Sequence, residues 1–188
     1  MIAAYFQSLG FFDREEITQI VQLFEYRTLN KNDFFVKENQ PCNEVAFIAS
    51  GIFRSYYSTS SAEDVTYCFR FPNSLMAAYS SFITGGPSVE TMQALSFAEL
   101  WVIKKSAIDK LAFESLAWTR YLKMIAEQQY LELEKRIFQL QKETASQRYM
   151  VLLRDQPEFI QQIPLQYLAS YLGITQRHLS RIRSEIIF

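Results

Sequence analysis

The segment LASYLGITQRHLSRIR, at positions 168–183, has a spacing of small and apolar residues that few folds can accommodate. Counted from Leu165, these residues stand at fixed offsets: Leu168, Ala169, Leu172, Gly173, Ile174, Leu179 and Ile182. Gly173 can adopt the positive φ that ends one helix and turns the chain, and Thr175 stands where the next helix needs an N-cap. Ala169 is small where the two helices would cross. The spacing therefore predicts a helix–turn–helix.

The outward face of the second helix is the candidate binding surface. Because Leu179 and Ile182 point into the predicted core, the remaining residues of this helix point outward. Arginine and glutamine pair bidentately with guanine and adenine edges, and a helix fits the major groove of DNA. We expect double-stranded DNA as the partner and these contact residues: Thr175, Gln176, Arg177, His178, Ser180, Arg181 and Arg183. The alternative is a solvated basic face, and a solvated side chain is the simpler interpretation of His178.

The composition excludes several classes of protein. The net charge is −1, so any electrostatic argument must be local, and no acidic residue lies between Glu158 and Glu185. His178 is the only histidine, which argues against metal sites with two or three histidines, Ser–His or Cys–His catalysis, and a cupin-like enzyme. Cys42 and Cys68 form no CxxC pair and are interpreted as reduced thiols. We expect no enzymatic activity, no cofactor and no bound metal.

Neither a signal peptide nor a membrane span is expected. The N-terminal segment lacks a cationic leader and reaches Asp13 quickly. The longest uncharged run, at 71–89, contains Asn, several Ser, two Pro and Gly-Gly, which makes it a poor membrane span. The sequence therefore predicts a cytoplasmic protein with no membrane partner.

Three regions follow one another along the chain. In residues 1–105, short helices precede many short apolar runs, which turn-prone clusters separate at intervals of roughly 8–12 residues, as in a β-roll or barrel. Helix formers dominate residues 106–146, without glycine or proline, and residues 147–188 form an all-helical unit. The predicted fold class is α+β: a double-stranded β-helix (jelly-roll-like) domain, a long dimerisation helix with its hinge, and a winged-helix-type helix–turn–helix domain.

The long helix carries a candidate dimer seam. Its apolar residues alternate steps of three and four, as a two-stranded seam does, although Gln129 interrupts the series. The predicted seam consists of Trp118, Leu122, Ile125, Gln129, Leu133, Ile137 and Leu140. We expect a homodimer that forms along this helix. The alternative is a helix that packs along its own domain.

A β-roll, a long helix and a helix–turn–helix, in this order, resemble the Crp–Fnr family of bacterial transcription regulators. The segment LASYLGITQRHLSRIR carries the resemblance most strongly, and NEVAFIASGIFRSYY supports it, because Gly51 occupies the family's turn between two strands. The resemblance implies a homodimer that binds a palindromic DNA site through paired recognition helices. It also implies an effector, a small molecule bound in the roll, and RNA polymerase as a further partner.

The sensor region departs from the best-known members of the family. Their cyclic-nucleotide cassette resembles Gly-Glu followed, after a spacer, by Arg-Ser-Ala, whereas the matching stretch here, 71–95, has no Gly-Glu pair and has Ser88 in place of the arginine. No cation lies between Arg70 and Lys104. A buried phosphate without a charged or strongly donating partner costs several kcal/mol. We therefore expect that cyclic AMP does not bind in the usual way.

Other sensors of the family fit no better. An iron–sulfur cluster needs four cysteines and the haem type needs a histidine in the roll, and the sequence has neither. Two interpretations of the roll remain: it binds an unknown uncharged or apolar ligand, or it is only a scaffold. The candidate pocket residues are Tyr79, Phe82, Ser88 and Thr91, although core packing explains Tyr79, Phe82 and Thr91 equally well.

Two functions therefore remain open. The first is a DNA-binding transcription regulator. The alternative is a small-molecule-binding or scaffold module whose terminal helices mediate protein–protein contact. Only the regulator predicts a DNA affinity that falls with salt concentration.

Overall fold

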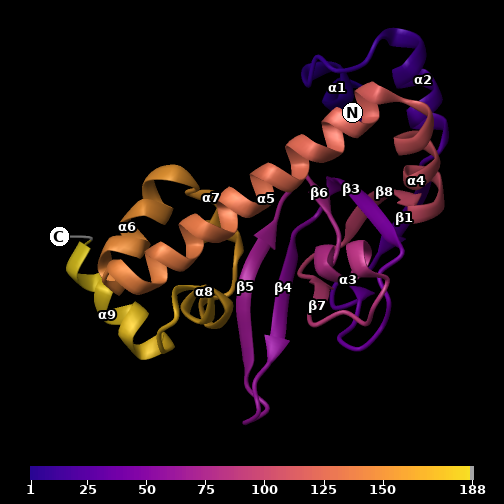
Figure 1. Cartoon of the computed structure of the whole chain (residues 1–188). Coiled ribbons are helices and arrows are strands. Elements are labelled where there is room, and N and C mark those ends of the chain that lie inside the picture. The colour runs from indigo at the N-terminus through magenta and orange to yellow at the C-terminus, as the bar shows by residue number, and fades with distance from the viewer. Residues whose placement is uncertain (187–188) are drawn as a thin grey trace. The chain divides into compact units, whose positions relative to one another are not determined.

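The computed structural model describes residues 1–186, apart from the side chain of Phe159 (Figure 1). Ile187 and Phe188, at the end of the predicted domain 147–188, lie outside the described residues. The chain is a mixed α+β protein with a β-sandwich and a long helix, as the sequence predicts. The strands are β1 (Glu25–Leu29), β2 (Phe34–Val36), β3 (Glu44–Ser50), β4 (Phe53–Ser58), β5 (Asp64–Arg70), β6 (Leu75–Met76), β7 (Thr91–Ala94) and β8 (Ala98–Lys104). The helices are α1 (Ile2–Ser8), α2 (Arg14–Gln22), α3 (Tyr79–Thr84), α4 (Lys105–Glu114), α5 (Leu116–Lys142), α6 (Ala145–Asp155), α7 (Glu158–Gln162), α8 (Leu165–Leu172) and α9 (Gln176–Ile186).

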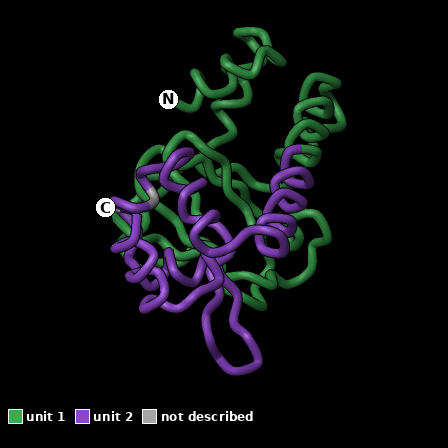
Figure 2. The backbone as a smooth tube through the Cα atoms, turned by 90° about the vertical axis from the view of Figure 1, so that its left-hand side faces the viewer, with its two compact units in different colours: residues 1–55, 69–127 green, residues 56–68, 128–188 purple. Residues whose placement is uncertain are grey.

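The chain packs as two compact units (Figure 2). Unit 1 contains residues 1–55 and 69–127, and unit 2 contains residues 56–68 and 128–188. The division passes through α5 and through strands β4 and β5, so the end of the β4–β5 hairpin packs with the C-terminal helices. The predicted domains 1–105, 106–146 and 147–188 follow the order of the elements rather than this packing, and their limits stay a prediction.

The strands form two four-stranded sheets, with the orders β1-β8-β3-β6 and β2-β7-β4-β5. Strand β8 lies antiparallel to both β1 and β3. Strand β3 is buried on both faces: Ala46 and Ile48 point into the cluster inside the roll, and Phe47 points into a second cluster on the other side. Burial on both faces explains why this strand reads as a continuous apolar run rather than an alternating one.

An aromatic cluster joins the N-terminal helices to the start of α5. The ring of Phe6 lies 5.9 Å from the rings of both Trp118 and Tyr121, and the hydroxyls of Tyr5 and Tyr121 are 3.1 Å apart. Burial raises the pKa of Tyr121, so its hydroxyl stays protonated. Trp118 is only 2% exposed. The prediction that Trp118 belongs to a dimer seam is therefore wrong, because its own unit already covers the side chain.

Gly51 allows two segments to approach closely where β3 leads into β4. Its φ is +95°, and a Cβ at this position would lie 2.6 Å from the Cβ of Ala98 and 2.8 Å from the carbonyl oxygen of Phe97. Both the backbone conformation and the short distance require glycine.

Gly51→Ala should lower the free energy of unfolding of unit 1 by about 2–5 kcal/mol, because it adds a steric clash to the strain of a positive φ. Gly85→Ala is the matched control, since Gly85 has a φ of +72° but, apart from its two chain neighbours, no described residue has an atom within 4 Å of the added Cβ. The control should lose only about 1–2 kcal/mol. Urea unfolding followed by tryptophan fluorescence reports on unit 1, which contains Trp101 and Trp118. Equal losses in the two variants would contradict the clash.

Candidate nucleic-acid interface

The turn between α8 and α9 occupies residues 173–175. Gly173 adopts the left-handed conformation, with a φ of +70°, as the sequence predicts. The N–H of Gly173 donates to the carbonyl of Ser170, and the N–H of Ile174 donates to the carbonyl of Ala169, each over 3.0 Å. These two bonds end α8 and leave α9 free to start in a new direction.

The inner face of this helix pair is closely packed. The predicted interior residues are buried: Leu168, Ala169, Leu172, Leu179 and Ile182 are each between 0 and 2% exposed. Leu179 and Ile182 therefore fix which face of α9 points inward.

The opposite face of α9 is exposed. Of the seven predicted contact residues, Arg183 is half-buried. The other six are exposed: Thr175, Gln176, Arg177, His178, Ser180 and Arg181. Thr175 accepts a hydrogen bond at Oγ1 from the N–H of His178 over 3.2 Å, which confirms its predicted role as the cap of the helix. In the described part of the chain, neither Arg177 nor Arg181 forms an ion pair, so both guanidinium groups face solvent.

Two arginines that the sequence analysis missed hold the end of α8. Arg136, on α5, donates from Nη2 to the carbonyl of Tyr171, and its guanidinium lies 4.0 Å from the centre of the Tyr171 ring. Arg148, on α6, donates to the carbonyl of Leu172 from Nη2 over 2.8 Å and from Nε over 3.2 Å. Together with the turn bonds, these contacts satisfy all four terminal carbonyls of α8, and the two positive charges complement the C-terminal end of its dipole. Burial lowers the pKa of Arg136.

The candidate pocket residues of the roll have local structural roles. Phe82 belongs to the aromatic cluster, 5.1 Å below the ammonium of Lys105. Ser88 Oγ donates to the carbonyl of Glu90 over 2.7 Å and accepts from its N–H over 3.1 Å. Thr91 Oγ1 accepts from the N–H of Glu38 over 3.0 Å. These contacts support the packing interpretation, and a ligand role for these residues stays a prediction.

Glu90 is an unexpected feature of the same segment. It is only 5% exposed and lies two residues after Ser88, the position at which the sequence predicts that the family's arginine is missing. Burial raises the pKa of Tyr79, the fourth candidate pocket residue, which is half-buried at the start of α3. The segment therefore contains an acidic residue near the position where a phosphate site needs a cation.

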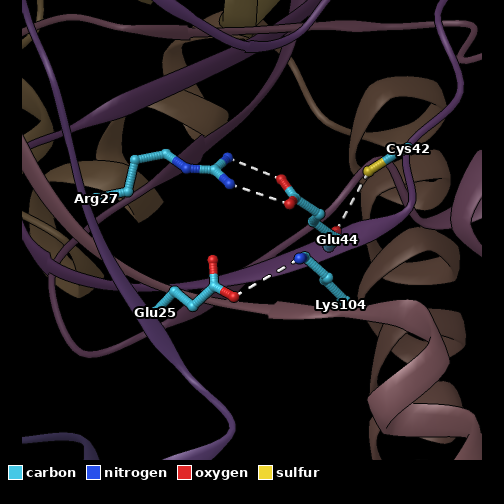
Figure 3. A network of polar contacts seen from close by, with 5 residues as sticks. All are labelled: Glu25, Arg27, Cys42, Glu44 and Lys104. Atoms are coloured by element: carbon cyan, nitrogen blue, oxygen red, sulfur yellow. Dashed lines mark hydrogen bonds and ion pairs between the residues drawn. The ribbon is translucent and has the colours of Figure 1, made fainter.

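A network of polar contacts in unit 1 consists mostly of paired charges (Figure 3), and two of its residues, Glu44 and Lys104, line a surface hollow. Arg27 and Glu44 form a bidentate pair with distances of 2.7 and 3.0 Å, which raises the pKa of Arg27. Lys104 lies 3.6 Å from Glu25. Cys42 donates from Sγ to the carbonyl of Glu44 over 3.4 Å, and burial raises the pKa of its thiol. Because cations and carboxylates neutralise one another here, the hollow does not select a charged ligand.

Most of the large apolar residues in the first half of α5 are packed within unit 1, whereas those in the second half are exposed. Leu122 and Ile125 pack against the aromatic cluster, and Gln129 is half-buried. Three other predicted seam residues are exposed: Leu133 by 58%, Ile137 by 44% and Leu140 by 47%. Large exposed residues that the prediction did not include lie beside them: Tyr130, Leu131 and Phe138.

The described residues offer neither a cluster of metal ligands nor a membrane-spanning helix. Within the described residues, no group of three or more His, Cys, Asp or Glu is placed to hold a metal ion. In that same part of the chain, no helix combines the length and the apolar character that crossing a bilayer requires.

Comparison with known proteins adds to this geometry. Residues 26–115 match the family described as cyclic nucleotide-binding domain. The roll has the fold of a cyclic nucleotide-binding domain. No curated protein sequence matches the chain.

Solved structures extend the likeness from this domain to the long helix and beyond. FixK2 from Bradyrhizobium japonicum has a TM-score of 0.76 at 19% identity, over 87% of this chain and 84% of that one. A protein from Eubacterium rectale assigned to the Crp/Fnr family has a TM-score of 0.73 at 16% identity, over 95% and 85% of the two chains. CLP from Xanthomonas campestris, described as a c-di-GMP responsive global regulator, has a TM-score of 0.67 at 14% identity, over 93% and 91%. The predicted resemblance is thereby confirmed for the fold.

Arg148→Met should weaken the end of α8, because the carbonyl of Leu172 loses its guanidinium donor while the bulk of the side chain is kept. We expect a loss of about 1–3 kcal/mol in the local stability of unit 2. Hydrogen exchange of the peptide that spans residues 165–174 measures it. Arg154→Met is the control, since Arg154 is exposed and, among the described residues, pairs with its neighbour Asp155. Faster exchange in both variants would show that the effect is not specific to the cap.

Proposed function

We propose that the protein is a homodimeric transcription regulator of the Crp–Fnr type that binds a palindromic DNA site through α9. The observation that carries the proposal is the exposed basic face of α9, which Leu179 and Ile182 anchor on the opposite side. We assign DNA binding to residues 147–188, as a helix–turn–helix domain, and dimerisation to the helix within 106–146. The fold shared with FixK2 and with the Eubacterium rectale protein supports this assignment.

The contact residues divide by chemistry. Gln176, Arg177 and Arg181 are exposed and carry the groups that pair with base edges in the major groove. The hydroxyl, imidazole and guanidinium groups around them suit phosphate oxygens, which position the helix without reading sequence: these belong to Thr175, His178, Ser180 and Arg183. In a dimer, two such helices match a palindrome when they lie about 34 Å apart, one turn of DNA.

Arg181→Ala should weaken binding to a cognate palindrome by about 1–3 kcal/mol and relax base preference at one position of each half-site, because a bidentate contact to guanine is lost. Fluorescence anisotropy with a set of single-base variants measures both effects. Arg154→Ala, on α6, is the control for loss of one exposed cation. Wild-type affinity should also fall as salt rises. A wild-type protein without salt-dependent DNA affinity would favour the scaffold alternative.

The exposed apolar stripe of α5 is the proposed dimer surface. Tyr130, Leu133, Ile137 and Leu140 follow one another at steps of three and four residues and are between 44 and 64% exposed. This alternation is typical of a two-stranded seam, so the occupant that we propose is the same helix of a second copy. Compared with the seam predicted from sequence, the stripe starts later along the helix, beyond the part that packs on the aromatic cluster.

Ile137→Glu should shift the protein toward the monomer, because it places a charge in the centre of this stripe. Sedimentation velocity at several concentrations measures the dissociation constant, which we expect to rise roughly 100-fold or more. Phe113→Glu is the control, since Phe113 is 93% exposed on α4, outside the stripe. A dimer that forms equally well in the Ile137→Glu variant would place the interface elsewhere.

The roll does not bind cyclic AMP in the usual way in this proposal. Ser88 stands where the family has an arginine, and the buried Glu90 adds an acid to the same segment. A phosphate would therefore meet a hydroxyl in place of the family's arginine, with the carboxyl of Glu90 two residues away. An uncharged or apolar effector, or a roll without effector, fits these residues better. RNA polymerase is the further partner that the resemblance implies.

A further inference from the structure

One edge of strand β5 faces helix α8. β5 ends the sheet order β2-β7-β4-β5, so among the described strands none lies beside the edge opposite β4 in that sheet. The part of the hairpin that carries this edge, residues 56–68, belongs to the same compact unit as α8 (Figure 2). An open strand edge presents a row of backbone donors and acceptors that other groups can bind.

The hydroxyl of Ser170 bridges two backbone groups of this edge. The N–H of Thr66 donates to Ser170 Oγ over 2.9 Å, and Ser170 Oγ donates to the carbonyl of Asp64 over 3.2 Å. Residues two apart in a strand direct these groups to the same side. One side chain on α8 therefore takes the place of a neighbouring strand, a role that needs a group that both donates and accepts.

Ser170 lies in the last turn of α8, directly before the two residues whose carbonyls bind Arg136 and Arg148. Its own carbonyl receives the N–H of Gly173, which begins the turn to α9. Helix α8 is thus held by β5 through a side chain and by α5 and α6 through its carbonyls. Of these three contacts, the one with β5 connects it to strands that continue into the sheet of the roll.

We propose that Ser170 is a positioning residue that couples the β4–β5 hairpin to the helix–turn–helix and sets the direction in which α9 meets DNA. The inference rests on the proposed function. Ser170 itself does not contact DNA, since its hydroxyl is engaged with the hairpin. Any displacement of the hairpin is passed through these two hydrogen bonds to α8, and through the short turn to α9. In a dimer, this contact would contribute to the spacing between the two recognition helices, together with those of Arg136 and Arg148.

Valine and threonine have nearly the same shape, so substituting each of them for Ser170 distinguishes the effect of the hydroxyl from the effect of side-chain size. Ser170→Val removes the donor and acceptor, whereas Ser170→Thr keeps the hydroxyl with the same branching. The first measurement, on the full chain without DNA, is the amide hydrogen exchange of Thr66 by NMR. We expect exchange at least roughly tenfold faster in S170V and close to wild type in S170T. Ser146→Val, at an exposed position of α6, is the control for adding a valine to a helix.

The second measurement is affinity for palindromes whose half-sites are moved apart by one or two base pairs. S170V should bind the best-spaced palindrome roughly threefold to tenfold more weakly and discriminate less between spacings, while S170T should keep the wild-type profile. A merely structural role would weaken all spacings alike.

Each result bears on the inference. Equal Thr66 exchange in S170V and wild type would overturn the coupling. Faster exchange with an unchanged spacing profile would overturn the positioning role. Should the wild-type protein bind no palindrome at all, the proposed function fails, and Thr66 exchange still decides whether the hydroxyl couples the hairpin to α8.

Discussion

The abrupt change of direction at Gly173 is the constraint on which the rest of unit 2 depends. A helix that ends in this way leaves four carbonyls without partners inside the helix. Here the turn supplies two donors, and Arg136 and Arg148 supply the others. Because these donors come from three places in the chain, the end of α8 is fully paired only when α5, α6 and the turn are all in position. The position of α9, and with it the position of its exposed face, therefore depends on the same contacts.

In the function that we propose, the roll keeps a known fold while its chemistry differs. Residues 26–115 retain the architecture of a cyclic nucleotide-binding domain, with an apolar interior and a glycine where β3 leads into β4. The segment that would hold a phosphate instead uses Ser88 to fix its own backbone and buries Glu90. Because charge at one or two positions determines which anions a buried site accepts, architecture alone does not define the ligand.

Parts of this structure follow from local sequence patterns, and parts do not. The core of the α8–α9 pair was predictable because its residues lie at short, fixed separations set by helix geometry. Trp118 was not, because a helix periodicity says which residues share a face but not which neighbour covers it. Arg136 and Arg148 escaped prediction for a related reason, since a contact between an arginine and a distant carbonyl leaves no periodic trace. Glu90 gave no signal, because nothing local distinguishes a buried acid from an exposed one.

The Ser170 bridge has a consequence for solubility. While it is intact, the outer edge of β5 is occupied by a helix and offers no template to another chain. If α8 moved away, the backbone of residues 64–66 would be open to strand addition, next to the aromatic residues Tyr56 and Tyr67 of the same hairpin. Large excursions of the C-terminal helices therefore carry a risk of self-association, and selection against aggregation would favour keeping them small.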